Sequence, residues 1–174
     1  MFYSLIGYRG CGKSTLAPVL AQKLNLDWVD ADIELEERVG KTIADIFAQQ
    51  GEPAFRAYEA ETLKALYAGK PQVIATGGGA VLNAELRELM GNSGPVIWLQ
   101  ASLTTTLDRL LNDPTTGQRR PALTDQDPET EICTVYNSRV PLYEQTATVT
   151  IQTDQKTVEE LVEEILTQLS QQPS

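Results

Sequence analysis

The chain has 174 residues, of which 41% are hydrophobic and 22% charged, a balance typical of one soluble globular domain with a substantial core. Its net charge of −10 argues against nucleic acid or an anionic membrane as a partner. The chain contains no histidine, which excludes His-based catalytic triads and His metal sites, so a general base near neutral pH would most often be Asp or Glu.

The first predicted elements frame a phosphate-binding loop. Residues 2–6 predict a short buried strand, and a helix is expected from Lys13 to about Asn25. Between them, the stretch Gly7-Tyr8-Arg9-Gly10-Cys11-Gly12-Lys13-Ser14 matches the P-loop pattern G-x-x-x-x-G-K-[ST] at every fixed position. Its glycines would turn backbone N–H groups around a phosphate, Lys13 would reach the outer phosphates, and the Ser14 hydroxyl would hold Mg²⁺. An ordinary Gly-rich turn is the alternative reading.

Two carboxylates follow the second predicted strand, at residues 27–30. If the strand extends through Asp32, alternation points Asp30 and Asp32 the same way. One could lie in the outer shell of Mg²⁺, and the other could orient an acceptor hydroxyl and take its proton during attack on a γ-phosphate. The alternative is that Asp32 only caps the helix predicted at residues 31–39.

Two further helices are predicted over residues 43–50 and 53–68, the first beginning at a Thr42 cap and ending at Gly51. Arg56 and Glu59 lie three residues apart on the second helix. They would form either a solvated ion pair or a guanidinium held by Glu59 for a substrate carboxylate, and the sequence leaves both readings open.

A third strand, at residues 73–75, runs into Gly77-Gly78-Gly79. Three consecutive glycines remove side chains where a substrate would approach the backbone, although a flexible turn is the alternative. A helix capped by Asn83 through residue 90, a strand at 96–99 and a helix at 103–111 are expected next.

Residues 112–127 carry Arg119 and Arg120 in a stretch rich in Pro, Thr, Asp and Gly. Such a segment is typical of a mobile lid, and an arginine on it could close over phosphates, although a solvated arginine is the alternative. A helix is expected from residue 129 to about 140, ending at Pro141, and a fifth strand at 149–152. A helix over residues 158–169 with a capping box, followed by a frayed tail at 171–174, completes the chain.

Strands that alternate with helices predict an α/β fold, a parallel sheet covered on both faces, with ligands at the carboxyl ends of the strands. A single domain is expected over residues 1–170. Its substrate-binding helices would span about residues 31–62.

Taken together, these motifs resemble the shikimate kinase family over nearly the whole chain. The resemblance rests on the following stretches: Gly7–Thr15, Asp30-Ala31-Asp32, Gly51-Glu52 with Phe55-Arg56 and Glu59, Thr76–Ala80, Arg120-Pro121, and Arg139 ahead of Pro141-Leu142-Tyr143. The P-loop is shared by many unrelated proteins, whereas this combination is specific.

The resemblance implies a three-layer P-loop kinase with five parallel strands in the order 2-3-1-4-5. It implies ATP-dependent phosphorylation of the 3-hydroxyl of shikimate, with Mg²⁺ held by Ser14 and reached by Asp30 through water. Catalysis would fall to Lys13, Asp32 and Arg120. Asp32 and five further residues would contact shikimate: Arg56, Gly77, Gly78, Gly79 and Arg139. Glu59 would orient Arg56. The ATP contacts would be Gly10, Cys11, Gly12, Lys13, Ser14, Thr15, Arg120 and Arg109, which would pack on adenine.

Two other functions fit parts of the pattern. A gluconate-type kinase would share the P-loop and an Asp pair, and a nucleotide-binding module without catalysis would need neither Asp32 nor Arg120. The protein is expected to be a monomer, with small-molecule substrates as its only partners. Cys11 and Cys133 suggest no disulfide framework, and with no signal peptide or apolar run of about 20 residues, a reducing cytoplasm is the expected location.

Overall fold

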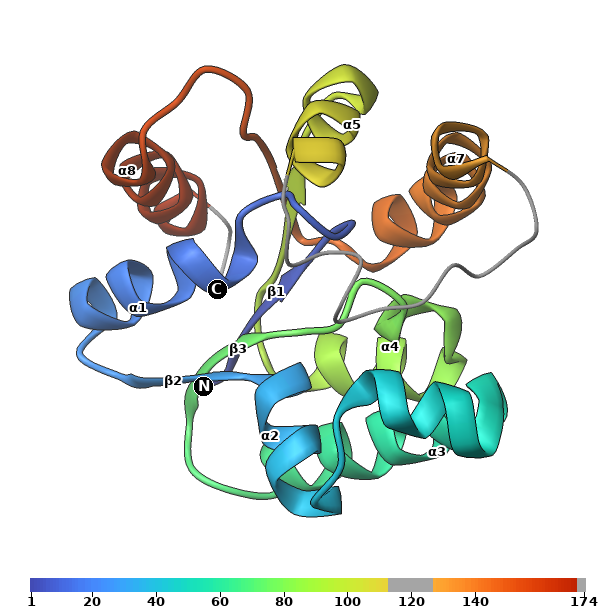
Figure 1. Ribbon diagram of the computed structural model, residues 1–174. Coiled ribbons are helices and arrows are strands. Elements are labelled where there is room, and N and C mark those ends of the chain that lie inside the picture. Colours follow the sequence, from blue (N-terminus) through green and yellow to red (C-terminus); the bar gives the residue numbers. More distant parts are fainter. Residues whose placement is uncertain (113–126, 172–174) are drawn as a thin grey trace.

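The computed structural model, described here for residues 1–112 and 127–171, contains one five-stranded parallel sheet (Figure 1). Its order is β2-β3-β1-β4-β5, and all four pairings are parallel. The strands are β1 (Tyr3–Ile6), β2 (Asp27–Asp30), β3 (Gln72–Ala75), β4 (Val96–Gln100) and β5 (Val149–Gln152). The α/β class and the strand order expected from the sequence are confirmed.

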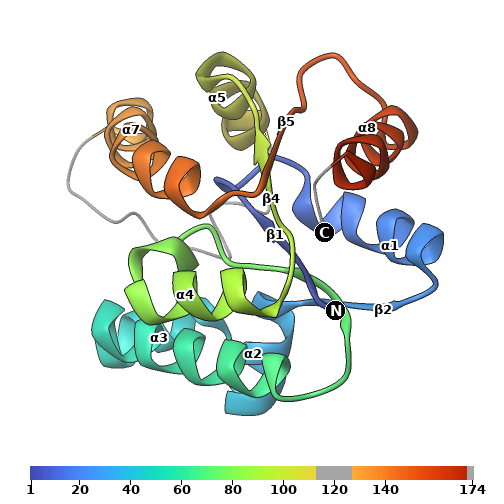
Figure 2. The same cartoon turned by 180° about the vertical axis from the view of Figure 1, so that it is seen from behind.

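Helices cover both faces of this sheet and make the fold three-layered (Figures 1 and 2). Helices α1 and α8 lie on one face, while α3, α4 and α7 lie on the other. No described helix combines the length and apolar composition needed to cross a membrane. The helices are α1 (Lys13–Leu24), α2 (Ala31–Val39), α3 (Ile43–Tyr67), the short 3₁₀ helix η1 (Ala80–Leu82), α4 (Ala84–Ser93), α5 (Leu103–Asn112), α7 (Pro128–Thr146) and α8 (Val158–Ser170).

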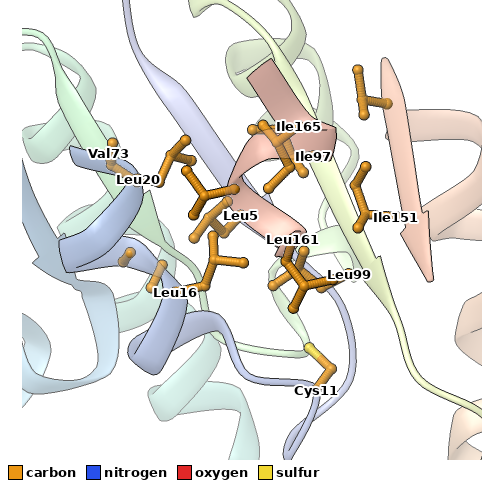
Figure 3. Close-up of a cluster of buried hydrophobic side chains, with 14 of the residues drawn as sticks. Leu5, Cys11, Leu16, Leu20, Val73, Ile97, Leu99, Ile151, Leu161 and Ile165 are labelled. Carbon is orange, nitrogen blue, oxygen red and sulfur yellow. The ribbon is translucent and has the colours of Figure 1, made fainter. Parts of the chain in front are cut away.

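Each face of the sheet has its own apolar core because the central strands are buried on both sides. Figure 3 shows the first core, in which Leu5 of β1 meets Leu16 of α1 and Leu161 of α8. On the other face, Ile74 and Trp98 pack with Leu63, Met90 and Tyr143 from three different helices. These two cores fix β1 at the centre of the sheet, so the loop that follows it opens at the middle of the carboxyl edge.

Helix α7 corrects one boundary. The helix predicted to end at Pro141 runs on to Thr146. A proline inside a helix removes one hydrogen bond, here the one to the Asn137 carbonyl. Tertiary packing outweighs this loss, because Tyr143 is 1% exposed and stacks on Trp98 with ring centroids 5.7 Å apart.

The region between β2 and β3 contains one confirmed break and one correction. Gly51 interrupts α3 with φ 79° and ψ 175°, so the two predicted helical segments meet at a kink, and the Thr42 side chain caps the first. Strand β2 ends at Asp30, however, and Asp30 rather than Asp32 caps α2 by accepting from the N–H groups of Asp32 and Ile33. Alternation along a strand therefore does not set the direction of Asp32, which lies in the first turn of a helix.

Candidate active site

The P-loop joins the central strand β1 to helix α1. Gly7, Gly10 and Gly12 all have positive φ, at 139°, 77° and 98°, a region that side chains strongly disfavour. A Cβ on Gly7 would lie 2.5 Å from the carbonyl oxygen of Leu99 on the neighbouring strand. Conformation therefore favours glycine at all three positions, and at Gly7 the neighbouring strand also leaves no space for a side chain.

Lys13 folds back over this loop. Its Nζ donates to the carbonyl oxygens of Gly7 at 2.8 Å and Tyr8 at 3.0 Å, and it lies 3.5 Å from the Cys11 Sγ. The residue is only 8% exposed. The loop carbonyls thus hold the one ammonium group of the P-loop in a fixed place beside its glycines.

Ser14 and Asp30 meet at the start of α1. The Ser14 hydroxyl donates to the Asp30 Oδ2 at 2.5 Å, while Oδ1 of the same carboxylate caps α2. A hydroxyl and a carboxylate are hard oxygen ligands of the kind Mg²⁺ prefers, so this pair fits the metal expected at a P-loop. Within the described residues there is no cluster of three or more carboxylate or thiol side chains that could hold a metal alone.

A cleft of about 340 Å³ opens at the carboxyl edge of the sheet. It brings the P-loop together with Asp32 and with Gly78 of the loop after β3. Thr76 also lines it, and its side chain is anchored by donating to the Leu5 carbonyl at 2.9 Å. Its full lining is Arg9, Gly10, Gly12, Lys13, Ser14, Thr15, Asp30, Asp32, Thr76 and Gly78.

Arg56 lies directly against Gly79. A Cβ on Gly79 would come within 2.7 Å of the guanidinium carbon, so any larger residue would force this guanidinium to move. Arg56 Nη1 donates to Glu59 at 2.7 Å, and its Nε and Nη2 donate to Glu52 at 3.1 and 3.0 Å. Burial alone would lower the pKa of Arg56, but the carboxylates of Glu59 and Glu52 outweigh it and raise that pKa, so the guanidinium stays charged.

Helix α7 supplies a second arginine to the same glycine loop. Arg139 is buried, and its Nη1 donates to the Gly78 carbonyl at 3.2 Å. The Tyr143 hydroxyl, one turn further along, donates to the same oxygen at 2.6 Å, and burial raises the pKa of this tyrosine, so it stays protonated. The Arg139 guanidinium also lies 5.7 Å from the ring centre of Tyr8 in the P-loop. Gly78 thus lies where α7 meets the P-loop.

The other predicted residues lie in several places. Arg109 of α5 is exposed, and its Nη1 donates to the Gly10 carbonyl at 2.9 Å, so it lies against the P-loop. Cys11 and Gly77 are buried outside the cleft lining, and the Gly77 carbonyl accepts from Ala80. Arg120, with the rest of the predicted lid at residues 113–126, lies outside the described residues, as does part of the tail, residues 172–174.

Three neighbours of this site were not assigned by the sequence. Glu52 stands four residues before Arg56, a spacing that places both on one helix face. Tyr143 stands four residues after Arg139, but the predicted helix end at Pro141 hid that relation. Thr76 is part of the Thr-Gly-Gly-Gly motif, and no pattern in the sequence distinguishes its anchored hydroxyl from an ordinary strand threonine.

Comparisons with known proteins agree with this geometry. The family model described as shikimate kinase matches residues 9–170. A shikimate kinase from Rhodopirellula baltica is 44% identical over 162 residues, covering 93% of this chain and 87% of the relative. One from Symbiobacterium thermophilum is 42% identical over 170 residues, covering 96% and 95%.

Solved structures give the same result. A shikimate kinase from Acinetobacter baumannii in complex with shikimate has a TM-score of 0.89 at 35% identity and covers 97% of this chain and 92% of its own. A gluconokinase from Sinorhizobium meliloti has a TM-score of 0.56 at 15% identity, covering 97% of this chain and 91% of its own, which shows a shared fold alone. The chain therefore belongs to the shikimate kinase family.

Proposed function

We propose how the residues of this cleft divide the work of ATP-dependent shikimate phosphorylation, the activity of the family to which the chain belongs. The reaction moves the terminal phosphoryl group of ATP to the 3-hydroxyl of shikimate and leaves ADP. The single observation that carries the proposal is one cleft lined by P-loop residues on one side and by Asp32 and Gly78 on the other.

The P-loop forms the donor half of the cleft. Backbone N–H groups around Gly10, Gly12 and the start of α1 bind the phosphates of ATP, and Lys13 leaves its loop carbonyls to pair with the outer phosphates. Thr15 lines the same half. Arg109 is supported as a nucleotide contact by its hydrogen bond to Gly10.

The loop after β3 forms the acceptor half, together with the two arginines that lie against this loop outside the cleft lining. Arg56 and Arg139 provide the guanidinium groups for the shikimate carboxylate and hydroxyls beside Gly78 and Gly79. Gly77 is proposed to contribute through the backbone of the same loop. Because Glu52 and Glu59 already fix Arg56, little side-chain entropy is lost when the carboxylate binds.

Asp32 acts at the boundary between the halves. Its carboxylate accepts the hydrogen of the 3-hydroxyl and orients the oxygen toward the γ-phosphorus. As the new oxygen–phosphorus bond forms, the bond from phosphorus to the β–γ bridging oxygen breaks, the hydroxyl proton passes to Asp32, and ADP carries away the bridging oxygen and its charge. Arg120 is proposed to neutralise charge on the transferred group.

Ser14 and Asp30 are the residues that would hold Mg²⁺, the first directly and the second through water. When bound, the metal neutralises charge on the phosphates. We further propose that the protein is a monomer in the cytoplasm. The location is supported by the free thiols of the two described cysteines, Cys11 and Cys133, which a reducing compartment maintains.

A coupled ADP-release assay with MgATP and a panel of small hydroxy acids tests the function. Turnover is expected with shikimate and not with gluconate, and the product should carry phosphate on the 3-oxygen, as phosphorus NMR would show. Absence of ADP with shikimate would refute the proposal, and preferential turnover of gluconate would replace it with the gluconate-type alternative.

A further inference from the structure

Arg9 is a cation of the P-loop to which neither the P-loop pattern nor the proposed mechanism gives a role. It precedes Gly10 and lines the cleft together with Lys13 on the donor side and Asp32 and Gly78 on the acceptor side. A Cβ on Gly78 would lie 3.3 Å from the Arg9 backbone nitrogen, so the residue is packed against the acceptor loop. It therefore stands at the point where the two halves of the cleft meet.

The Arg9 side chain is held by its neighbour Tyr8, while one of its N–H groups has no acceptor in the described part of the chain. The residue is half-buried, and its Nε is buried without a hydrogen-bond partner among the described residues. Its guanidinium carbon lies 5.8 Å from the ring centre of Tyr8, within the range of a cation–π contact. Leaving a buried N–H without an acceptor is unfavourable, which points to a missing acceptor in the cleft.

Tyr8 makes this arrangement rigid. Its ring is buried and packs edge-on against Tyr136 of α7, with centroids 5.7 Å apart. Burial raises the pKa of Tyr8 more than the nearby Arg9 and Arg139 lower it, so the ring stays neutral and keeps the electron-rich face that attracts a guanidinium. Arg9 and Arg139 thus share one aromatic support, one on the P-loop and one on the acceptor side.

We infer that Arg9 binds the phosphoryl group during its transfer and afterwards in the product. Arg56 and Arg139 already lie at Gly79 and Gly78, where the acceptor's own groups bind, whereas Arg9 belongs to the loop that holds the phosphates. The group that passes between these two positions is the phosphoryl group. A guanidinium is suited to it because its planar donors match phosphate oxygens in pairs. This inference rests on the proposed function.

Calorimetric binding of three ligands to Arg9→Met tests it. Shikimate 3-phosphate carries the transferred group, whereas shikimate and ADP lack it. We expect the Kd of shikimate 3-phosphate to rise about tenfold or more, the size of a lost hydrogen bond to a charged group, while the Kd of shikimate and of ADP stay within about twofold. The kcat should fall by a factor similar to the change for shikimate 3-phosphate, and Arg9→Lys should recover part of both.

Arg38→Met is the matched control, because Arg38 lies on α2 in an exposed pair with Glu34 and does not line the cleft. It should behave as wild type. If Arg9→Met destabilises the P-loop, as a lower Tm would report, Arg9→Gln keeps a polar side chain there and allows the same comparison.

Two outcomes would overturn the inference. Equal weakening of shikimate and shikimate 3-phosphate would mean that Arg9 holds the acceptor itself, and unchanged binding of all three ligands would make it a solvated arginine. The wild-type assay separates these failures from that of the proposed function: an inactive wild type contradicts the function, whereas an active wild type with an unaffected Arg9→Met contradicts only the role of Arg9.

Discussion

The proposed donor and acceptor halves of the site are built by different means. The donor half comes from one uninterrupted stretch whose shape depends on glycine backbone conformation, and its lysine is held by carbonyls of the same loop. The proposed acceptor half depends on side chains from three distant segments that reach one glycine loop. Asp32 of α2 lines the cleft with Gly78, Arg56 of α3 lies against Gly79, and Arg139 of α7 donates to the Gly78 carbonyl.

The two halves should therefore be sensitive to different substitutions. Changes inside the P-loop should damage the donor half most, whereas the acceptor half should also be sensitive to residues that orient its separate parts. Substitutions in one half should therefore leave the other half intact, and a variant that weakens both would contradict this contrast.

Asp32→Asn should show the largest difference between the two halves, because it lowers kcat without changing nucleotide binding. The amide keeps the size of the side chain but cannot take a proton, so kcat should fall by about 10²–10⁴ while the Kd of ADP is unchanged. Coupled ADP release and calorimetry measure the two quantities. The exposed Asp27, on the same strand-to-helix segment, gives Asp27→Asn as a control with wild-type kcat. An unaffected kcat in Asp32→Asn would remove Asp32 from the acceptor side.

Gly79→Ala should damage the acceptor half alone. The added methyl group would overlap the Arg56 guanidinium and displace it, so the KM for shikimate should rise by about 10- to 100-fold, with little change in the KM for ATP. Steady-state kinetics with each substrate varied in turn measures this. A Cβ added to Gly91 on α4 would meet no atom within 4 Å, so Gly91→Ala should leave both KM values unchanged. Equal increases in both would show that the halves are not separable.

The two carboxylates that hold Arg56 should contribute unequally. Glu59 is 5% exposed at the side chain and Glu52 is 47% exposed, and an exposed ion pair is screened by water. Glu59→Gln should raise the KM for shikimate by about tenfold and Glu52→Gln by less than about threefold. The same kinetic assay ranks them, and the reverse order would mean that burial does not decide how firmly Arg56 is held.

The smallest effect is expected at Glu160, which belongs to neither half. Its pKa is lowered by hydrogen bonds from the Thr157 backbone and side chain in the capping box of α8. A lowered pKa means that the ionised form stabilises the fold above the ordinary glutamate pKa, and that this contribution disappears as the pH falls through the lowered value. Glu160→Gln keeps a hydrogen-bond acceptor but loses the charge, so its Tm should be slightly lower than that of wild type at neutral pH. The two Tm values should converge in acid. The kcat of the variant should equal that of wild type at every pH. A constant difference in Tm at every pH would exclude a charge effect.

The same contrast explains how much of the molecule the sequence could predict. The P-loop and the caps at Thr42, Asn83 and Thr157 follow from short patterns whose physics is local, whereas the strand order is expected only from the family resemblance. The sequence could not decide whether Arg56 is solvated, because its guanidinium lies against Gly79, which is distant in sequence and adjacent in space.

The conditional strand extension through Asp32 and the helix end expected at Pro141 both differ from the structure, for different physical reasons. Strand alternation does not set the direction of Asp32 because the strand ends at Asp30, whose carboxylate takes over the cap of α2. The role of Tyr143 is hidden because local rules end a helix before Pro141, while stacking on Trp98 extends it. At Asp32 one local interaction, the Asp30 cap, replaces another, whereas at Tyr143 tertiary packing overrides a local preference.

Because Cys11 is buried in the P-loop, the rate at which it is alkylated should report how often this loop opens. The residue is 2% exposed and its sulfur lies beside Lys13, while Cys133 on α7 is half-buried. An alkylating reagent can reach Cys11 only when the loop opens. The ratio of the labelling rate of Cys11 to that of Cys133 therefore measures the frequency of loop opening. Nucleotide that pins the loop should slow this labelling, which gives a reading of loop opening without any engineered probe.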